Sequence, residues 1–325
     1  MRTPKFWYNE PNIISSALLP LSKIYALSCS IRNKFINPSS ATAPIICIGN
    51  LVAGGAGKTL VALSLANVLK DHSVAFLTRG YGGSFVGPMK VNYEIHSFNQ
   101  VGDEALLLSR AAPTWLAHDR VAGARAAISD GAKVIIMDDG FQNLSLKKNY
   151  SLVVIEGETG FGNYRLLPSG PLRESVDDGL ARTDATIVIG NDKLGVSNII
   201  PKSIPRLNAS IVPTLEAKVL SGKRVAAIAG IGQPNKFYNT LKGMQCCIVS
   251  KHTFSDHHVY KQKEIMNICQ KASALDAIVV TTEKDWVRFP SKVKPMVKTV
   301  PVKLEWQDRK MIHSLLERVI DDWKM

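Results

Sequence analysis

Cysteine is scarce in this sequence and follows no ligand-binding pattern. The 325 residues include five cysteines, and no two of them have the spacing of a zinc-binding pair. An odd, scattered set of this kind is typical of a protein kept in a reducing compartment. The sequence therefore excludes a disulfide framework and a cysteine-based metal domain.

Long hydrophobic runs are also absent. A transmembrane helix needs about 20 consecutive, predominantly apolar residues, and no segment of the chain meets that requirement. The N-terminus lacks an apolar core followed by a small-residue cleavage site. We therefore expect neither a membrane-spanning helix nor a secretory signal.

Acidic residues are few relative to basic ones. Lys and Arg number 40 against 27 Asp and Glu, which gives a formal net charge of +13. Such a surplus favours a polyanionic partner, namely nucleic acid, an anionic membrane surface or a phosphorylated substrate. The basic residues are spread along the chain without an arginine-rich block, so we expect no nucleic-acid partner and favour the other two.

One stretch, residues 52–59, carries the pattern of a phosphate-binding loop. An apolar run at 45–48 leads into it and a helical run at 60–70 leaves it, which is the strand–loop–helix context of that loop. Glycines let backbone N–H groups converge on phosphate oxygens, and the helix start adds positive charge. The predicted nucleotide-binding residues are Val52, Ala53, Gly54, Gly55, Ala56, Gly57, Lys58 and Thr59.

Two of these residues have specific expected roles. Lys58 would reach the β- and γ-phosphates of ATP, and the Thr59 hydroxyl would bind Mg²⁺. The alternative is an ordinary glycine-rich turn before a helix. Val52 stands where the standard pattern has glycine, so the double glycine resembles the deviant loop of partitioning ATPases and dethiobiotin synthetase. Ala53 replaces the lysine that bridges the dimeric ATPases of that branch.

A pair of carboxylates follows the apolar strand predicted at 134–137. Asp138 and Asp139 stand at its end, downstream of the phosphate loop. A carboxylate in this position usually completes the Mg²⁺–nucleotide site. We expect Thr59, Asp138 and Asp139 to form the metal site, although a solvated turn would also explain the pair.

Alternating strands and helices predict an α/β fold of the P-loop NTPase type, with a mostly parallel sheet flanked by helices. Residues 191–222 are polar and interrupted by prolines, which indicates a domain boundary. A second α/β pattern follows. We expect a membrane-associated helix at 1–40, a P-loop kinase domain at 41–205 and a smaller α/β domain at 206–325.

The N-terminal helix admits two interpretations. Residues 12–36 carry apolar side chains at three- and four-residue spacing, interrupted at Pro20, with cations toward the end. The helix either packs on the protein's own core or lies in a membrane surface.

The loop at Asp256-His257-His258 also has several interpretations. Adjacent histidines can bind zinc, but no third ligand stands at useful spacing. The other options are a histidine that orients a base and a simple surface turn.

Together, these motifs resemble the tetraacyldisaccharide 4′-kinase family, the lipid A 4′-kinases, nearly end to end. The motifs are Pro20-Leu21-Ser22 with Tyr25, Gly49-Asn50-Leu51 with residues 54–59, Arg79-Gly80-Tyr81-Gly82, Gly102-Asp103-Glu104, residues 138–142 (Asp-Asp-Gly-Phe-Gln), residues 167–174 (Leu-Pro-Ser-Gly-Pro-Leu-Arg-Glu), Asp256-His257-His258 and Thr282-Glu283-Lys284-Asp285. Their order and spacing are more specific than any single motif.

The resemblance implies an ATP- and Mg²⁺-dependent kinase that phosphorylates the 4′-hydroxyl of a tetraacylated disaccharide 1-phosphate to give lipid IVA. It implies peripheral attachment at the cytoplasmic face of the bacterial inner membrane. The implied catalytic residues are Asp103 with His257 or His258, and Lys58; the implied substrate-binding residues are Arg79, Arg120, Arg173 and Glu174. Asp103 stands before a helix, so a plain N-cap is its alternative role.

Three departures from the family pattern affect detail. Asn143 stands where the family commonly has histidine, Leu60 replaces a proline after Lys-Thr, and Val259 replaces a proline after His-His. None removes a residue with an expected role in chemistry. Two rival functions use the same motifs: a membrane-associated P-loop switch NTPase for partitioning or metal delivery, and a non-catalytic membrane-binding scaffold. The sequence indicates no oligomeric state.

Overall fold

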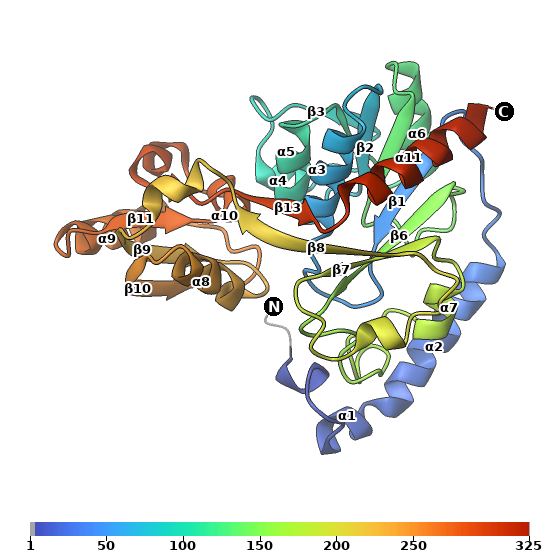
Figure 1. The fold of residues 1–325 in the computed structure, drawn as a ribbon, viewed down its shortest axis with the longest axis horizontal. Helices are drawn as coiled ribbons and strands as arrows, with labels where there is room; N and C mark the ends of the chain where they lie inside the picture. Colours follow the sequence, from blue (N-terminus) through green and yellow to red (C-terminus); the bar gives the residue numbers. More distant parts are fainter. Residues whose placement is uncertain (1–3, 325) are drawn as a thin grey trace.

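The computed structural model describes residues 4–324, which form two lobes around two separate sheets (Figure 1). The first three residues of the expected N-terminal segment lie outside the described part. The larger sheet has, in order across it, β13 (Val302–Trp306), β8 (Arg206–Pro213), β7 (Ala185–Ile189), β6 (Tyr150–Glu156), β1 (Ile45–Gly49), β5 (Val134–Asp138), β2 (Val74–Thr78), β4 (Thr114–Leu116) and β3 (Met89–Val91).

The inner strands of the larger sheet run parallel, and only its edge strands β13 and β3 pair antiparallel with their neighbours. Strands β1, β2, β5 and β7 are buried along their whole length. Parallel strands covered on both faces read as continuous apolar runs, which is why the sequence pattern located them. The expected mostly parallel α/β fold is confirmed.

Helices cover both faces of this sheet. The helices of the described chain are α1 (Ile13–Ala17), α2 (Leu19–Lys34), α3 (Lys58–Val68), α4 (Phe98–Val101), α5 (Asp103–Ser109), α6 (Arg120–Ser129), α7 (Val176–Leu180), α8 (Pro234–Gly243), α9 (Gln262–Ser273), α10 (Glu283–Trp286) and α11 (Arg309–Lys324). Helices α3 and α11 pack on one face through Leu65, Ile312 and Leu316, and α6 packs on the other through Ala124 and Ala127.

The smaller sheet has the order β10 (Cys247–Thr253), β9 (Arg224–Ala229), β11 (Ile278–Thr281) and β12 (Lys298–Thr299), and its strands are parallel. Helix α8 packs on one side through Phe237 and Leu241, and α9 on the other through Ile265 and Ile268. This sheet, with α8, α9 and α10, forms the smaller lobe (Figure 1).

The sheets divide the chain differently from the expected boundary at residue 206. Residues 206–213 form β8, which pairs with β7 in the larger sheet, and the chain returns at 302–306 as β13 beside β8. Leu304 of β13 and the apolar side of α11 join the same core as α3. Strand β8 alternates buried and exposed residues at its start, so it lacks the continuous apolar run of its neighbours. We propose that the smaller domain covers about residues 217–299, between two segments of the larger one.

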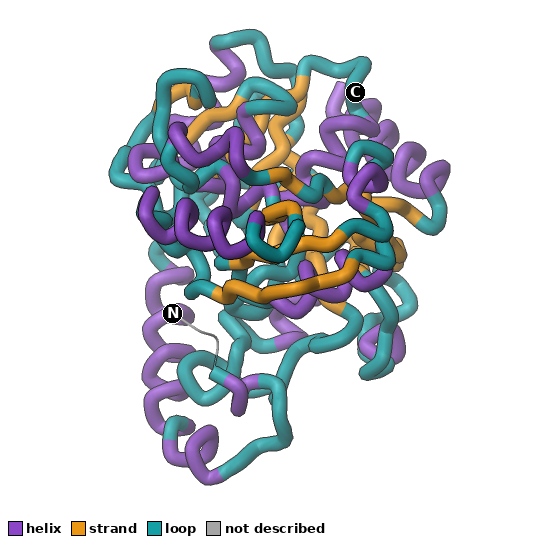
Figure 2. Tube along the Cα trace, turned by 90° about the vertical axis from the view of Figure 1, so that its left-hand side faces the viewer, coloured by secondary structure: helices purple, strands orange, loops and turns teal. Residues whose placement is uncertain are grey.

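The N-terminal helix has the reverse of an ordinary amphipathic pattern. In α1 and α2 the buried residues are Ser15 and Ser22, whereas the large apolar side chains Ile13, Ile24 and Leu27 are exposed by 88%, 64% and 62%. Figures 1 and 2 show α2 running along the outside of the larger lobe. These apolar residues therefore do not pack on the protein's own core, which was one of the two interpretations.

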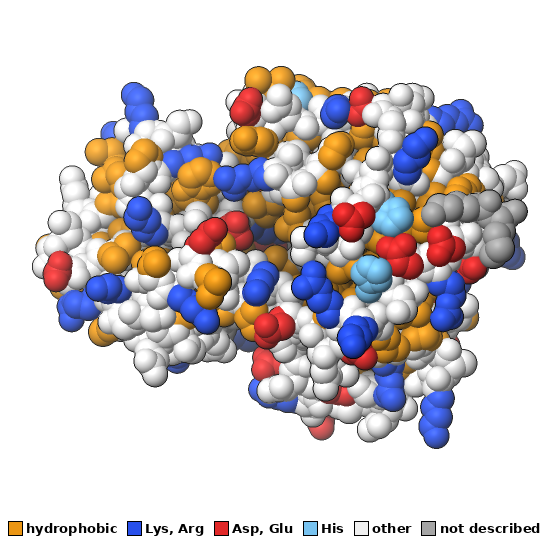
Figure 3. Space-filling model, turned by 45° about the horizontal axis from the view of Figure 1, so that its top comes forward, with side chains coloured by type: hydrophobic (Ala, Val, Ile, Leu, Met, Phe, Trp, Pro, Cys, Tyr) orange, Lys and Arg blue, Asp and Glu red, His pale blue; other side chains and the backbone are white. Residues whose placement is uncertain are grey.

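No helix in residues 4–324 combines the length and apolar character needed to cross a membrane. Basic side chains are distributed over the face shown in Figure 3 instead of gathering in one patch. This agrees with the spread of Lys and Arg along the sequence.

Candidate active site

The phosphate loop leaves the central strand of the larger sheet. It follows β1, which lies between β5 and β6, and α3 begins at Lys58. Gly57 has φ +84°, a left-handed conformation that favours glycine. The Ala53 N–H donates to the Pro171 carbonyl at 2.7 Å, so the loop is held by the irregular segment 162–174. The strand, loop and helix arrangement expected from the sequence is present.

Lys58 is held above this loop by two side chains. Its Nζ donates to Asn50 Oδ1 at 3.0 Å and lies 3.4 Å from Asp139 Oδ1. Only 10% of the Lys58 side chain is exposed. The ammonium group is thus positioned by residues on both sides of the loop. Asn50 belongs to one of the sequence motifs, but the motif did not indicate this contact.

Asp138 is a buried carboxylate with one unsatisfied oxygen. It ends β5 opposite Ile48 of β1, and its Oδ2 accepts from the Thr59 hydroxyl at 3.2 Å. Its Oδ1 is buried without a hydrogen-bond partner among the described residues. Burial, with the charges of Glu104 and Asp139, raises the Asp138 pKa to about 7. An uncompensated carboxylate beside a hydroxyl fits a hard divalent cation with oxygen ligands.

Asp139 is placed differently from its neighbour. Its φ of 51° turns it toward Lys58 and toward Arg173, whose Nη1 lies 3.2 Å from Asp139 Oδ1. Burial alone would raise the Asp139 pKa, but Lys58 and Arg173 outweigh it and lower the pKa. Asp139 is thus a satisfied anion that orients two cations, whereas Asp138 has the features of a metal ligand.

The predicted substrate residues separate into two groups. Arg173 donates to Asp139 and to Gln142 Oε1 at 3.1 Å, and Glu174 accepts from Gln142 Nε2 at 3.0 Å and pairs with Arg182. These contacts make Glu174 a support for the loop 162–174. Gln142 also donates to the Asn50 carbonyl at 2.9 Å, so it connects that loop to the phosphate loop.

Arg79 and Arg120 lie on the other side of β5, after β2 and at the start of α6. Arg120 is 3% exposed, donates to the Ala117 carbonyl, and has a buried Nε without a partner among the described residues. Burial, followed by the nearby Arg79, lowers the Arg120 pKa to about 10. The charge of Arg79 acts on Arg120, and such mutual repulsion between two cations is relieved by a bound anion.

The structure brings His257 to Asp103 across the two lobes. Nδ1 of His257 lies 2.9 Å from Asp103 Oδ2, although 154 residues separate them in the chain. The N-cap of α5 is Gly102, and Asp103 Oδ1 accepts from the Glu104 N–H at 2.9 Å. Only 2% of the Asp103 side chain is exposed, against 29% for His257. The imidazole is therefore the more accessible member of the pair.

His258 does not contact Asp103. Its Nε2 lies 3.3 Å from Glu264 Oε2, and its ring stacks on Phe254. The two candidate histidines are thereby distinguished, since His257 faces the larger lobe and His258 stays within the smaller one. Among the described residues, no group of three His, Cys, Asp or Glu side chains is arranged to hold a metal ion.

The N-terminal segment borders the same site. The Trp7 indole N–H donates to the Pro168 carbonyl at 3.1 Å, and the Asn163 N–H donates to the Trp7 carbonyl at 2.8 Å. The Tyr8 hydroxyl lies 3.6 Å from where a Cβ on Gly54 would stand. The segment before α1 therefore packs against the loop 162–174 and reaches the phosphate loop.

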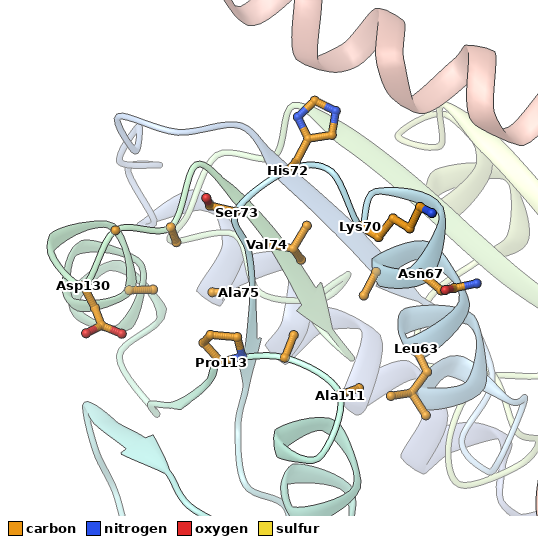
Figure 4. Close-up of a pocket in the computed structure, with 15 residues that line it drawn as sticks. Leu63, Asn67, Lys70, His72, Ser73, Val74, Ala75, Ala111, Pro113 and Asp130 are labelled. Atoms are coloured by element: carbon orange, nitrogen blue, oxygen red, sulfur yellow. The ribbon is translucent and has the colours of Figure 1, made fainter.

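A cavity of about 590 Å³ lies elsewhere (Figure 4). It is lined by Ser73, Val74 and Ala75 at the amino end of β2, with Lys70 and Asp130 at its rim. The phosphate loop and Asp138 stand at the carboxyl ends of their strands, where open α/β sheets bind ligands. This cavity is thus at the opposite edge of the sheet from the site.

A glycine-rich loop on the central strand, with a buried carboxylate on the adjacent strand, defines an α/β P-loop protein that binds nucleotide phosphates. A family model described as tetraacyldisaccharide-1-P 4′-kinase matches residues 14–321. The chain belongs to this kinase family, and the resemblance drawn from the motifs is confirmed.

Relatives and a solved structure agree over nearly the full length. Tetraacyldisaccharide 4′-kinase of Paramagnetospirillum magneticum is 45% identical over 98% of this chain and 99% of its own, and that of Rhodospirillum centenum is 42% identical over 97% and 96%. The crystal structure of the "apo" form LpxK from Aquifex aeolicus in complex with ATP matches with a TM-score of 0.77 at 25% identity. That match covers 95% of this chain and 100% of the other.

The unsatisfied charge on Asp138 generates a stability prediction. Its folded-state pKa of about 7 lies above the ordinary value of about 4. Stability is therefore highest below pH ~4, where Asp138 is protonated in both states, and falls as pH rises from there to about 7. Asp138→Asn removes that charge. We expect its thermal midpoint to exceed that of the wild type by a few °C at pH 8, since ~1 kcal/mol shifts a domain of this size by roughly 2–4 °C, and to match it only at about pH 3, below the ordinary carboxyl pKa.

Asp139→Asn is the matched control, because the Asp139 pKa is lowered and its charge is stabilising above the ordinary carboxyl value. Its midpoint at pH 8 should fall. Both are measured by thermal denaturation in metal-free buffer. A lower midpoint for Asp138→Asn at pH 8 would contradict an uncompensated buried carboxylate.

Proposed function

We propose that the protein transfers the γ-phosphate of ATP to the 4′-hydroxyl of a tetraacylated glucosamine disaccharide 1-phosphate, giving lipid IVA. The observation that carries the proposal is the Asp103–His257 pair, a candidate proton acceptor in a chain of this kinase family. The charge of Glu104, next to Asp103, acts on the pKa of Asp138, so the two parts form one site. The names of the relatives and the ATP complex of the Aquifex aeolicus protein support the same function.

The loop residues 52–59 cradle the phosphates of ATP through backbone N–H groups, and Lys58 moves from Asn50 and Asp139 onto the transferring phosphate. Thr59 and Asp138 would hold Mg²⁺, and the unsatisfied buried Oδ1 of Asp138 supports this assignment. When bound, the ion neutralises charge that develops on the phosphate oxygens. Asp139 keeps Lys58 and Arg173 oriented.

The Asp103–His257 pair acts as one proton acceptor for the sugar hydroxyl. A hydroxyl is a poor nucleophile, so a base that removes its proton as the phosphate transfers lowers the barrier. The buried carboxylate holds Nδ1–H, which leaves Nε2 of the more exposed imidazole able to take a proton. Asp103 then stabilises the positive imidazolium.

The acyl chains of such a substrate stay in the membrane, so the enzyme works at the membrane surface. The exposed apolar residues of α1 and α2, with Lys23, Arg32 and Lys34, form an interfacial helix for an anionic surface. We propose peripheral attachment at the cytoplasmic face of the inner membrane. Arg79, Arg120 and Arg173 are the candidates for binding the phosphorylated headgroup.

The function is tested with radiolabelled ATP and a tetraacylated disaccharide 1-phosphate in mixed micelles. Wild-type protein should move label to the lipid, whereas a switch NTPase would move it to water and a scaffold would move none. Lys58→Ala should lower the rate by about 10²–10³-fold, because it removes a charge from the transferring phosphate. Thermal denaturation checks its fold, and retention of more than about a tenth of the activity would contradict the role of Lys58.

The proton acceptor is tested by the kcat of single and double variants. Asp103→Ala and His257→Ala should each lower kcat by ~10²–10⁴-fold, with little further loss in the double variant, because either change disables the same unit. His258→Ala is the matched control and should keep most of its kcat, since His258 faces Glu264. If Asp103 served only the helix start, Asp103→Ala would cost about 1 kcal/mol of stability and leave kcat near normal.

Membrane attachment is tested on vesicles that contain anionic lipid. Ile24→Ser with Leu27→Ser should weaken sedimentation with vesicles by at least about tenfold, because each side chain loses its burial in the lipid surface. Leu215→Ser with Val219→Ser is the control, since these side chains are 78% and 75% exposed elsewhere. Point variants keep Ser15 and Ser22, which hold the loop 162–174. Equal loss in both pairs would contradict an interfacial role for α2.

A further inference from the structure

Two cations of the smaller lobe face two carboxylates of the larger lobe beside the proton acceptor. Asp103 and Glu104 form the first turn of α5, and Lys284 and Arg288 lie four residues apart on and just after α10. Lys284 Nζ donates to Glu104 Oε1 at 2.9 Å. Arg288 Nε lies 3.4 Å from Asp103 Oδ2, the same oxygen that faces His257.

Arg288 is one of the most buried charged side chains described in this chain, at 1% exposure. Its Nη2 donates to Asp285 Oδ1 at 2.6 Å and to the Gly230 carbonyl at 2.9 Å. Its Nη1 donates to the His258 carbonyl at 3.2 Å. The guanidinium thus connects three segments of the smaller lobe, including the loop that carries His257. Its Nε donates to the Lys284 carbonyl at 3.2 Å and lies within ion-pair distance of Asp103.

Asp285, which is itself held by other residues of the smaller lobe, fixes the position of Arg288. Asp285 is fully buried, and its Oδ1 also accepts from the Tyr260 hydroxyl at 2.7 Å and the Gly230 N–H at 3.0 Å. A buried charge held by several hydrogen bonds is costly to displace. Arg288 is therefore rigid, and Asp103 must meet it at a set position.

Lys284 makes the second ion pair between the lobes, and its side chain is more exposed than that of Arg288. Burial by itself would lower the Lys284 pKa, and the carboxylates of Glu104, Asp103 and Asp256 outweigh burial and raise it. The lysine stays charged across the working pH range, so its attraction for the first turn of α5 is always present. Two cations of the smaller lobe thus face two carboxylates of the larger lobe.

We propose that Lys284 and Arg288 are positioning residues that hold the smaller lobe against α5, so that His257 reaches Asp103. Neither cation contacts the reacting atoms. Lys284 acts through Glu104, and Arg288 acts through Asp103 and the backbone of the histidine loop. This inference rests on the proposed function only for its effect on catalysis, since the contact between the lobes is testable without substrate.

The test is a reciprocal exchange of charge, with Lys284→Glu, Glu104→Lys and the double variant. Each single change places like charges opposite one another, so we expect kcat to fall by about 10²-fold, as expected for ~1 Å of misplacement. The KM for ATP should stay within about twofold, because the phosphate loop is unchanged. The double variant should recover to within about tenfold of wild type, since the attraction is restored.

Hydrogen exchange at the amides of α5, without lipid or nucleotide, supplies the independent measurement. Exchange in residues 103–109 should be faster in both single variants and slow again in the double variant. This pattern is expected even if the wild-type protein phosphorylates no lipid, so failure of the proposed function is distinguished from failure of this inference. Lys193→Glu is the control, because it reverses a 2.8 Å pair with Glu158 that lies within the larger lobe.

Two results would overturn the inference. A double variant no more active than the single ones would mean that Glu104 or Lys284 acts directly on phosphate or metal. Unchanged exchange in α5 despite a lower kcat would exclude a role in holding the lobes. Arg288→Lys keeps the charge and loses the planar fork; it should lower kcat by about tenfold or more with faster α5 exchange, and an unchanged kcat and exchange would remove Arg288 from the proposal.

Discussion

The contact between Asp103 and His257 joins the two lobes, so it depends on how the smaller lobe is attached to the larger one. One partner starts a helix on the larger lobe, and the other lies in a loop of the smaller lobe. The chain enters the smaller lobe after β8 and returns from it as β13, and these two strands pair with one another in the larger sheet. Helix α11 then anchors that connection by packing beside α3 on the larger sheet. Residues 302–324, which form β13 and α11, thus support the arrangement of the candidate active site.

Buried charge is handled in two opposite ways within this site. Asp139 is satisfied by Lys58 and Arg173, and Arg288 is satisfied by Asp285 and the carbonyls around it. Asp138 is left with an unpartnered oxygen and a raised pKa. Natural proteins tolerate such destabilising groups where function needs them. The contrast between two adjacent aspartates identifies which one has capacity for a ligand.

The N-terminal helix buries polar residues and exposes apolar ones. Its serines are buried and bonded to the loop 162–174, while its large apolar side chains face outward. The serines fix the helix on the protein and leave its large apolar side chains exposed, as the proposed membrane attachment requires. Because Trp7 and Asn163 tie the same loop to the start of the chain, and Pro171 ties it to Ala53, the surface helix and the phosphate loop share one support.

Local pattern was sufficient for the phosphate loop, the buried parallel strands and the carboxylates at the end of β5, because each is encoded by neighbouring residues. The sequence alone also indicated the family, since the order of its motifs survives without coordinates. Only the tertiary structure assigned β8 and β13 to the larger sheet, separated His257 from His258, and revealed Lys284 and Arg288 behind Asp103. These depend on contacts between residues far apart in the chain, and no spacing within a single segment records which side chains such contacts bring together.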